Sequence, residues 1–397
     1  MAHLKVLALV TRLPVPPWRG DQVRAFHHLR LLARRHEITL CALVLGRPRP
    51  EDVAGTQALG IAVEVVELGI AAALPALGRA CVDPRPLQAL LFRRRRAVDH
   101  VRRLVARERF DVVHAQLVRT GEYWLNGLGP PVVLDLVDAL STNFARRSSR
   151  DHGPLGWVSA LEGQRLKRYE QQLLAAAATS LVVSEPDRAA LGGTRVRVVP
   201  NGVDLTAFPF STAPRQPARI VFAGNLGYFP NVDAAQWLVE EILPAVRARV
   251  PEATVHLVGA RPAPALRALA RAGRLTLAAD VADMAPEVAG AAVSVIGMRC
   301  GSGMQNKVLE AMAVGTPVVT TPQVAAALAV RDGEHVLLGS TVEELAAAAT
   351  ALILDPERAR GLARRARALV EHTYGWEASA SAVEAAWGDA IARASQG

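Results

Sequence analysis

The sequence predicts an α/β protein made of two doubly wound domains in tandem, each with a parallel β-sheet between layers of helices. Three observations support this fold class. Short apolar runs alternate with longer helical patterns along the chain, the alternation starts afresh at Arg219, and a proline-rich stretch separates the two rounds. With 397 residues, 51% of them hydrophobic and 21% charged, the chain is large enough for two hydrophobic cores.

The first round contains six short apolar runs of the length that buried strands have. We expect strands at Lys5–Val10, Glu37–Val44, Val63–Leu68, Val112–Ala115, Val132–Leu136 and Ser180–Val183. The helical patterns between them include Gln22–Arg34 and Leu161–Ala177. Because the first run is short and stops at Arg12 and Pro14, we interpret it as a β-strand and not as a signal peptide.

The second round repeats this organisation. Its expected strands are Arg219–Ala223, Thr254–Val258, Leu275–Leu277, Val293–Ile296, Pro317–Thr320 and Val336–Leu338, with helices such as Ala234–Ile242 and Leu309–Ala313 between them. Prolines and an Asn-Gly pair between Pro200 and Pro217 break both periodicities, so the joint lies there. We therefore expect domains at residues 1–199 and 200–375, followed by an amphipathic helix within 376–397. Because ligands bind outside the carboxyl ends of parallel strands, two facing sheets would form a binding cleft.

Several functional classes lack the motifs that they need. There is no G-x-x-x-x-G-K-[ST] loop, no G-x-G-x-x-G after the first strand and no G-x-S-x-G, which argues against mononucleotide kinases, dinucleotide dehydrogenases and the simplest hydrolases. Cys41, Cys81 and Cys300 are widely spaced, so neither a disulfide framework nor a zinc site is indicated. No Asp-x-Asp pair is present, and we expect no metal. No apolar run reaches the roughly 18–20 residues of a membrane span, so we expect a cytoplasmic protein.

The net charge of +9 is concentrated in one segment. Four consecutive arginines, Arg93–Arg96, open a stretch that continues to Arg109 with apolar residues at helical spacing, which predicts a basic amphipathic helix. Three interpretations remain open. The arginines form a solvated helix face, they contact an acidic membrane surface or an anionic acceptor at the inner membrane face, or they bind nucleic acid. No recognised nucleic-acid module accompanies the charges, so we expect no nucleic-acid partner.

The most informative segment runs from Arg299 to Ala313. It is a glycine-containing polar loop that follows the expected strand Ala291–Ile296 and leads directly into a helix. The backbone N–H groups and the dipole at a helix N-terminus bind anions. Lys307 adds a positive charge there, and Glu310, one turn further, can accept hydrogen bonds from sugar hydroxyls. This combination predicts a site for a phosphate beside a sugar.

A second polar loop follows the first expected strand. Gly20 permits a close backbone approach, Asp21 can cap the helix that we expect to begin near Val23, and Arg24 lies in the first turn of that helix. A ligand with phosphate or hydroxyl groups could bind here. An ordinary capped turn explains the same residues equally well.

Taken in order, these segments resemble the retaining glycosyltransferases of family 4, which have the GT-B fold. The resemblance rests on Gly20-Asp21-x-x-Arg24, Phe110–Ala115, Val199–Asp204, Phe222–Ala234 and Gln305–Ala313. The block Phe222–Ala234 is similar to a subgroup of bacterial sugar transferases of exopolysaccharide and natural-product pathways. The resemblance implies two Rossmann-like domains facing across a cleft, with the C-terminal helix crossing back to the first domain.

The resemblance also implies that the C-terminal domain binds a nucleotide sugar as co-substrate. Glu310 matches the second glutamate of the family's E-x7-E signature, which binds the ribose. Lys307 and Arg299 are then catalytic candidates that neutralise the diphosphate. Further expected donor contacts come from Gly20 and Asn225, from the backbone of Val281 near the nucleobase, and from Gly303, Met304, Gln305 and Asn306.

Two departures from the family pattern bear on this site. Ser302 stands where the first glutamate of the signature is usual, and that glutamate faces the donor sugar. Asn225 and Asn231 stand where a basic pair is often found, so we expect Arg299 and Lys307 to supply the charge.

On the acceptor side, we expect Asp21, Arg24, His114 and Asp138 to contribute. Asp138 follows a strand and falls where many relatives carry a catalytic-site histidine, so its carboxylate could orient the acceptor or stabilise positive charge on the sugar ring. A helix N-cap role for Asp138 and a packed, hydrogen-bonded role for His114 are the alternatives.

The expected activity is transfer of a sugar from a nucleotide diphosphate to an acceptor hydroxyl with retention of configuration. The expected pathway makes a polysaccharide, a glycolipid or a secondary metabolite of the aminoglycoside type. Two alternatives remain, a nucleotide-sugar 2-epimerase of the same fold and a non-catalytic nucleotide-sugar-binding protein.

Overall fold

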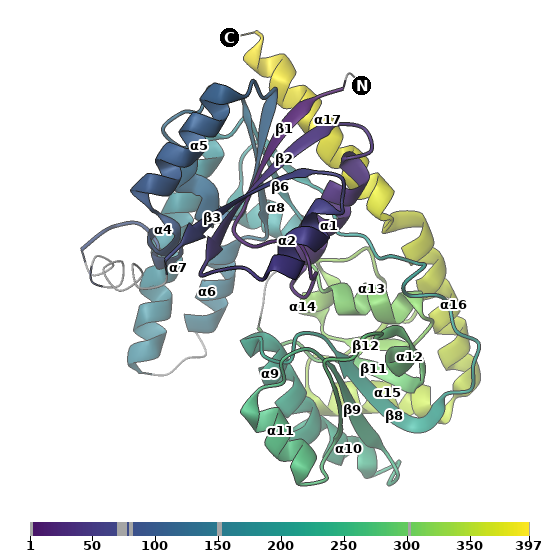
Figure 1. The fold of residues 1–397 in the computed structure, drawn as a ribbon. Helices are drawn as coiled ribbons and strands as arrows, with labels where there is room; N and C mark the ends of the chain where they lie inside the picture. Colours follow the sequence, from purple (N-terminus) through teal and green to yellow (C-terminus); the bar gives the residue numbers. More distant parts are fainter. Residues whose placement is uncertain (1–2, 70–77, 79–81, 149–152, 301–302, 397) are drawn as a thin grey trace. The chain divides into compact units, whose positions relative to one another are not determined.

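The computed structural model describes residues 3–69, 78, 82–148, 153–300 and 303–396. Cys81 and Ser302 lie outside these ranges. The chain divides into two compact units, one formed by Met1–Pro200 with Glu377–Gly397 and the other by Asn201–Trp376. Each unit is a parallel β-sheet with helices packed on it (Figure 1). The predicted fold class, two doubly wound Rossmann-like domains, is thereby confirmed.

The first unit contains a seven-stranded sheet in the order β3-β2-β1-β4-β5-β6-β7, with all neighbours parallel. The strands are β1 (Lys5–Val10), β2 (Glu37–Leu45), β3 (Ala62–Leu68), β4 (Val112–Gln116), β5 (Val132–Val137), β6 (Thr179–Val182) and β7 (Val196–Val198). Six were expected within one or two residues. The short strand β7 was not expected, because three residues give too little pattern to recognise.

Helices cover both faces of this sheet. They are α1 (Gly20–Leu32), α2 (Pro50–Gln57), α4 (Leu87–Phe92), α5 (Arg95–Arg107), the 3-10 helix η2 (Val118–Tyr123), α6 (Leu140–Ser148), α7 (Pro154–Ala176), α8 (Glu185–Leu191) and α17 (Trp376–Ala394). Alternate β1 residues divide between the faces. Leu7 and Leu9 belong to the core under α4, α5 and α7, whereas Val6 and Ala8 face α1 and α17 around a small space of about 20 Å³.

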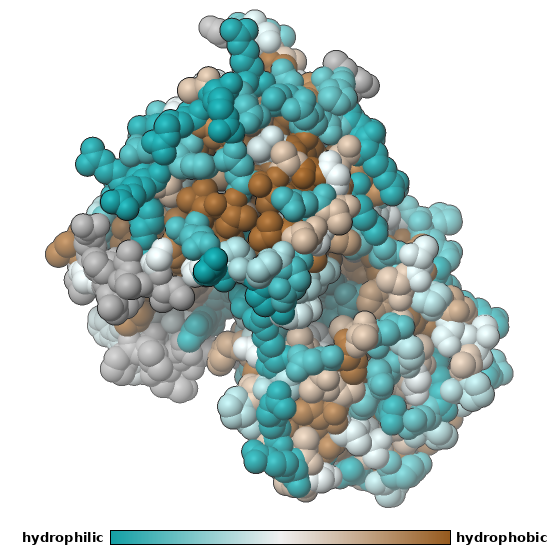
Figure 2. Space-filling model, in the orientation of Figure 1, coloured by the Kyte–Doolittle hydropathy of each residue, from teal (hydrophilic) through white to brown (hydrophobic). Residues whose placement is uncertain are grey.

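The basic segment is two helices and not the single helix that we expected. Helix α4 ends before Arg93 and α5 begins after Arg94, because both arginines have extended backbones. The Tyr123 hydroxyl donates a hydrogen bond to the Phe92 carbonyl at this break. Arg109 lies beyond the end of α5. The outer surface over α5 is hydrophilic (Figure 2).

The second unit contains a six-stranded sheet in the order β10-β9-β8-β11-β12-β13, again with all neighbours parallel. The strands are β8 (Gln216–Ala223), β9 (Thr254–Gly259), β10 (Thr276–Ala279), β11 (Ala291–Ile296), β12 (Val318–Thr320) and β13 (Leu337–Leu338). All six were expected in these places. They alternate with helices, so the sequence pattern identified every strand of this sheet.

The helices of the second unit are α9 (Phe229–Trp237), α10 (Leu243–Arg247), α11 (Pro264–Arg271), α12 (Ala285–Ala289), α13 (Asn306–Ala313), α14 (Pro322–Ala325), α15 (Val342–Leu354) and α16 (Pro356–Thr373). A π-helical turn, η3 (Leu238–Ile242), joins α9 to α10. Within the described residues, no helix is both long and apolar enough to cross a bilayer. The same residues contain no group of three His, Cys, Asp or Glu side chains arranged to hold a metal ion.

Candidate functional site

The second sheet has a topological switch point between β8 and β11. The chain runs outward from β8 through β9 to β10 and then returns to the other side of β8 to form β11. Loops after neighbouring strands diverge at such a point and leave room for a ligand beyond the carboxyl ends. Here the loops begin at Gly224 after β8 and at Gly297 after β11.

Glycines keep this edge compact. A Cβ atom added to Gly259 would lie 1.7 Å from the Gly224 carbonyl oxygen, and Gly259 has a φ of +146°. A Cβ atom on Gly224 would lie 3.1 Å from Cε of Lys307 and 3.3 Å from Nδ2 of Asn231. The two glycines therefore let the ends of β8 and β9 touch and make space for the lysine.

Lys307 lies in the first turn of α13, and its ammonium group reaches back to this edge. Nζ donates hydrogen bonds to Oδ1 of Asn231 at 2.9 Å and to Oε1 of Gln305 at 2.8 Å, and it lies 5.5 Å from the centre of the Phe222 ring. Burial lowers the pKa of Lys307 to about 8, although the charge of Glu310 opposes the shift. Asn231, which replaces an expected basic residue, therefore positions the lysine that is present.

Glu310 follows Lys307 by one helical turn. Its side chain is half-buried, and burial raises the pKa of its carboxyl group to about 7. Among the residues that the structure describes, none forms a hydrogen bond or an ion pair with this carboxylate. A desolvated carboxylate without a hydrogen-bond donor is costly, so its free oxygens suit a ligand with hydroxyl groups.

The loop before α13 places the other residues expected around the donor. Gly303 has a φ of +71°, Met304 is buried, and Gln305 occupies the N-cap position without a side-chain capping bond. Oδ1 of Asn306 accepts a hydrogen bond of 3.0 Å from Nδ2 of the buried Asn201. Asn201, from the Val-Pro-Asn-Gly motif, thereby fixes the start of α13.

Arg299 has a protein partner that the sequence did not reveal. Its guanidinium group forms a two-pronged ion pair with Asp233 of α9, with Nη2 to Oδ1 at 2.6 Å and Nε to Oδ2 at 3.2 Å. It also stacks over Trp237, 4.8 Å from the ring centre. Asp233 offsets the positive charge, so Lys307 is the stronger candidate for neutralising a diphosphate.

Two further predicted donor residues lie at the same edge of the sheet. The Asn225 side chain accepts a hydrogen bond from the Gly227 backbone at 3.1 Å, and its carbonyl accepts one from Nδ2 of Asn231 at 2.9 Å. Val281 is half-buried and follows Asp280, which has a φ of +52° and comes directly after β10. The structure therefore gathers the expected donor residues of this unit at the ends of β8, β10 and β11.

The first sheet has its own switch point, between β1 and β4. Helix α1 begins at Gly20, earlier than expected, so Asp21 lies inside the first turn and does not cap the helix. Instead its carboxylate forms an ion pair with Arg12, and its carbonyl accepts a hydrogen bond of 3.1 Å from Nε2 of Gln116. Gly20 is exposed, with open space around it.

Arg24 and His114 belong to a buried chain of polar groups. Nε of Arg24 donates to Asp135 at 2.6 Å and its Nη1 donates to the Val199 carbonyl at 2.8 Å. His114 lies 3.8 Å from the same carboxylate, and Nε1 of Trp387 donates to its Nδ1 at 3.2 Å. Burial lowers the pKa of His114 to about 4, so the ring is neutral at pH 7. These contacts join α1, β5 and α17 within the first unit.

Asp138 lies directly after β5 and is half-buried. Nearby, the fully buried Glu170 of α7 accepts hydrogen bonds from the backbone and the hydroxyl of Ser141. Burial is the main cause that raises the pKa of Glu170 to about 7, and the charge of Asp138 adds to it. Glu170 was not expected at the site. Its position between Leu166 and Leu173 on the buried stripe of α7 could have identified it as a core carboxylate.

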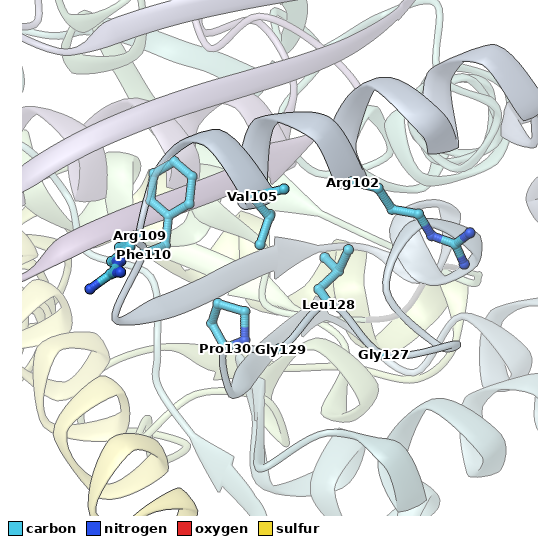
Figure 3. Close-up of a pocket in the computed structure, with 9 residues that line it drawn as sticks. Arg102, Val105, Arg109, Phe110, Gly127, Leu128, Gly129 and Pro130 are labelled. Atoms are coloured by element: carbon cyan, nitrogen blue, oxygen red, sulfur yellow. The ribbon is translucent and has the colours of Figure 1, made fainter.

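A larger cavity lies at the opposite end of the first sheet. It has a volume of about 410 Å³ and is lined by Arg102, Val105, Ala106, Arg109, Phe110, Gly127, Leu128, Gly129 and Pro130 (Figure 3). It adjoins the amino ends of β4 and β5, away from the switch point. Figure 3 shows that the guanidinium groups of Arg102 and Arg109 point in opposite directions. The cavity therefore lacks converging charges that would hold an anion.

Two family models match the chain. The model described as Glycosyltransferase Family 4 matches residues 18–207, and the model described as Glycosyl transferases group 1 matches residues 217–355. The first match covers most of the first unit, extends a few residues into the second, and contains His114 and Asp138. The second falls on the second unit and contains Lys307 and Glu310. A comparison with curated protein sequences finds no match.

Solved structures share the fold over nearly the whole chain. HepE from Anabaena, crystallised with UDP and glucose, is 18% identical, with a TM-score of 0.68 over 96% of this chain and 98% of HepE. Sucrose-phosphate synthase from Thermosynechococcus elongatus is 16% identical, with a TM-score of 0.71 over 98% and 100% of the two chains. A glycosyltransferase from Rickettsia africae is 9% identical, with a TM-score of 0.67 over 98% and 99%. At these identities the likeness establishes the GT-B fold.

Proposed function

We propose that this chain, a glycosyltransferase of the GT-B type, transfers a sugar from a nucleoside diphosphate to an acceptor hydroxyl with retention of configuration. The observation that carries the proposal is the pair on α13. Glu310 has a desolvated carboxylate without a hydrogen-bond donor among the described residues, and the Lys307 ammonium lies one turn earlier at the switch point. The hydroxyls of a ribose can donate hydrogen bonds to Glu310, and a diphosphate can supply a negatively charged partner for Lys307.

In this proposal the second unit stabilises the leaving diphosphate. Lys307 is mostly protonated at pH 7, because its pKa of about 8 lies above that pH. Its positive charge is desolvated by burial. A preorganised positive charge in a buried site lowers the energy of a leaving group that gains negative charge. The N-terminal N–H groups of α13 add to this effect. Glu310 positions the nucleoside through its ribose hydroxyls.

In the first unit we assign the acceptor side to Asp138. Its carboxylate follows a strand at the switch-point edge, where it can orient an acceptor hydroxyl or stabilise positive charge on the sugar ring. His114 is neutral and hydrogen-bonded to Trp387, so we assign it a positioning role. Asp138→Asn should then lower turnover at least tenfold and leave donor affinity unchanged. Loss of donor affinity in this variant would contradict the assignment.

The donor can be identified by a thermal-shift screen of nucleoside diphosphate sugars. UDP-glucose is the first probe, because HepE was solved with UDP and glucose. A ligand at 100 times its dissociation constant adds about 2.7 kcal/mol to the free energy of unfolding. Incubation of the donor with candidate glycolipid, polysaccharide and aminoglycoside acceptors then tests transfer, and NMR of the product reports the anomeric configuration.

The outcomes separate the proposal from its alternatives. Acceptor-dependent transfer with retention supports it, and inversion contradicts the mechanism. Rearrangement of the donor sugar without acceptor identifies a 2-epimerase instead. Donor binding without turnover on any acceptor identifies a binding protein.

Substitution distinguishes the two basic candidates of the donor site. Lys307→Ala should lower turnover at least a hundredfold, because it removes the only charge that the proposal places on the diphosphate. Arg299→Ala should have a smaller effect, since Asp233 already offsets its charge. Unchanged turnover in both variants would contradict the proposed site.

A further inference from the structure

The N-terminal end of α7 exposes a cluster of large apolar side chains. Trp157 is 83% exposed, Val158 is 64% exposed and Leu161 is 51% exposed. They lie within four residues of one another on one side of the helix, whereas Leu166 and Leu173 further along α7 are buried in the core. A clustered, exposed apolar surface of this kind indicates a binding surface.

The cluster is held in place by the packing of α6 against α7. A Cβ atom on Gly163 would lie 3.3 Å from Cβ of Phe144, so the two helices are in close contact there. Near the start of α6, Ser141 donates two hydrogen bonds to Glu170. The apolar cluster is therefore carried by a packed pair of helices (Figure 1).

The exposed charges that the structure describes on α6 and α7 are positive. Both glutamates of α7, Glu162 and Glu170, are buried, and the described residues of α6 include no acidic residue. The exposed charged side chains of the two helices are Arg147, Lys167 and Arg168. Basic residues next to exposed Trp and Leu match an anionic bilayer, in which apolar side chains enter the interface and cations contact lipid headgroups.

The spacing along α7 fits docking in which the N-terminal end of the helix enters the bilayer. Lys167 follows Leu161 by six residues, or about 9 Å along the helix axis. An interfacial apolar surface enters the headgroup and acyl boundary by about 5–10 Å. The Lys167 and Arg168 side chains can therefore reach the headgroups while Trp157, Val158 and Leu161 are buried among the lipids.

We infer that the α6–α7 pair docks the protein on an anionic membrane through Trp157, Val158 and Leu161, with Lys167 and Arg168 on the headgroups. The cluster lies about 14 to 20 Å along α7 from Glu170. Glu170 accepts hydrogen bonds from Ser141, which follows Asp138 by three residues. The contact would thus hold the carboxyl edge of the first sheet near the bilayer. Vesicle binding does not depend on sugar transfer, so this inference and the proposed function can fail separately.

Flotation with lipid vesicles tests the inference. The wild-type protein should float with vesicles of equal parts phosphatidylglycerol and phosphatidylcholine and remain unbound with phosphatidylcholine alone. The double variant Trp157→Ser/Leu161→Ser should reduce the bound fraction at least tenfold, and Lys167→Glu/Arg168→Glu should do the same. Leu354→Ser, which removes a 57% exposed leucine at the end of α15 in the second unit, is the matched control and should bind as wild type.

Other outcomes would overturn the inference. Binding that is lost in Arg102→Glu/Arg103→Glu and kept in the Trp157→Ser/Leu161→Ser variant would assign the membrane contact to α5 instead. Absence of wild-type binding to the anionic vesicles would exclude membrane docking by this cluster. Light scattering would then show whether Trp157→Ser/Leu161→Ser converts a dimer to a monomer, which would identify the cluster as an interface between copies of this chain.

Discussion

Lys307 and Glu310 are held where their charges are unfavourable. Burial lowers the pKa of the lysine and raises that of the glutamate, and Glu310 has no hydrogen-bond donor within the described residues. A protein selected for stability alone would place apolar side chains here, since buried charges are often neutral or destabilising relative to hydrophobic residues. The pair therefore points to a ligand that meets both groups.

The stability of a Glu310→Gln variant should reveal this cost. The pKa of Glu310 is raised to about 7 in the folded state, so the folded protein loses stability relative to its maximum as the pH rises from about 4.5 to about 7. The glutamine variant should not lose stability in this way, because its side chain does not ionise. Its free energy of unfolding should match wild type near pH 4.5 and exceed it by about 1–3 kcal/mol above pH 7.

Urea unfolding at pH 4.5 and pH 8 measures the difference. Glu241→Gln, at an exposed glutamate of the same unit, is the control and should show no such trend. A glutamine variant that is less stable than wild type at pH 8 would mean that Glu310 has a stabilising partner.

The titration of Lys307 should appear in nucleotide binding. Diphosphate binds best to the protonated amine, and burial lowers the pKa of Lys307 to about 8 in the free protein. The affinity for UDP should therefore fall as the pH rises from 8 to 9, by up to about tenfold per pH unit. Lys307→Arg should abolish the fall, because arginine stays protonated. Calorimetric titration measures the UDP affinity of wild type and of Lys307→Arg at each pH. A wild-type affinity that does not change with pH would show that Lys307 does not contact the phosphates.

At the scale of elements, most of the fold could be predicted from the sequence. Each strand except β7 was expected, because parallel strands are nearly continuous apolar runs. The break between α4 and α5 was missed, since its partner Tyr123 lies 31 residues away from Phe92. Side-chain contacts between residues far apart in the sequence could not be predicted for the same reason. Asp233 neutralises Arg299 across 66 residues, and Asp135 binds Arg24 across 111.

The switch-point edge depends on glycine at position 259. Gly259→Ala should destabilise the second unit by about 3 kcal/mol or more, because its Cβ would overlap the Gly224 carbonyl and its φ is +146°. Gly273→Ala is the matched control. It also has a positive φ, +69°, with open space around it, and should cost about 1–2 kcal/mol. Chemical denaturation compares the two, and equal losses would contradict the close approach of β8 and β9.

At the scale of the whole molecule, the C-terminal helix belongs to the unit that the N-terminus forms. Trp387 of α17 is buried and donates to His114, Ser379 contacts His28 at 2.9 Å, and Glu384 contacts His36 at 3.0 Å. The amphipathic pattern of this helix was visible in the sequence. Its partners were not, because they lie some 270 to 350 residues earlier.

Substitution of Trp387 should separate stability from donor binding. Trp387→Ala should lower the free energy of unfolding by about 3–5 kcal/mol, and Trp387→Phe by less, since the ring is largely kept. UDP affinity should not change in Trp387→Phe, because Lys307 and Glu310 lie in the second unit. Urea unfolding and calorimetric titration check this. A large loss of affinity with unchanged stability would mean that α17 contributes to the donor site.

The central claim is that the α13 pair binds a nucleoside diphosphate. The most direct test is the dissociation constant of UDP, or of the nucleoside diphosphate with the largest thermal shift, measured by calorimetry at pH 7.5 for wild type, Glu310→Gln and the control Glu241→Gln. Glutamine keeps one acceptor oxygen, but the charge and the second acceptor are lost. Loss of a hydrogen bond to a charged group costs about 1.5–3 kcal/mol, so Glu310→Gln should weaken binding about tenfold to a hundredfold. The control should bind as wild type. Equal affinity of all three proteins would contradict the claim.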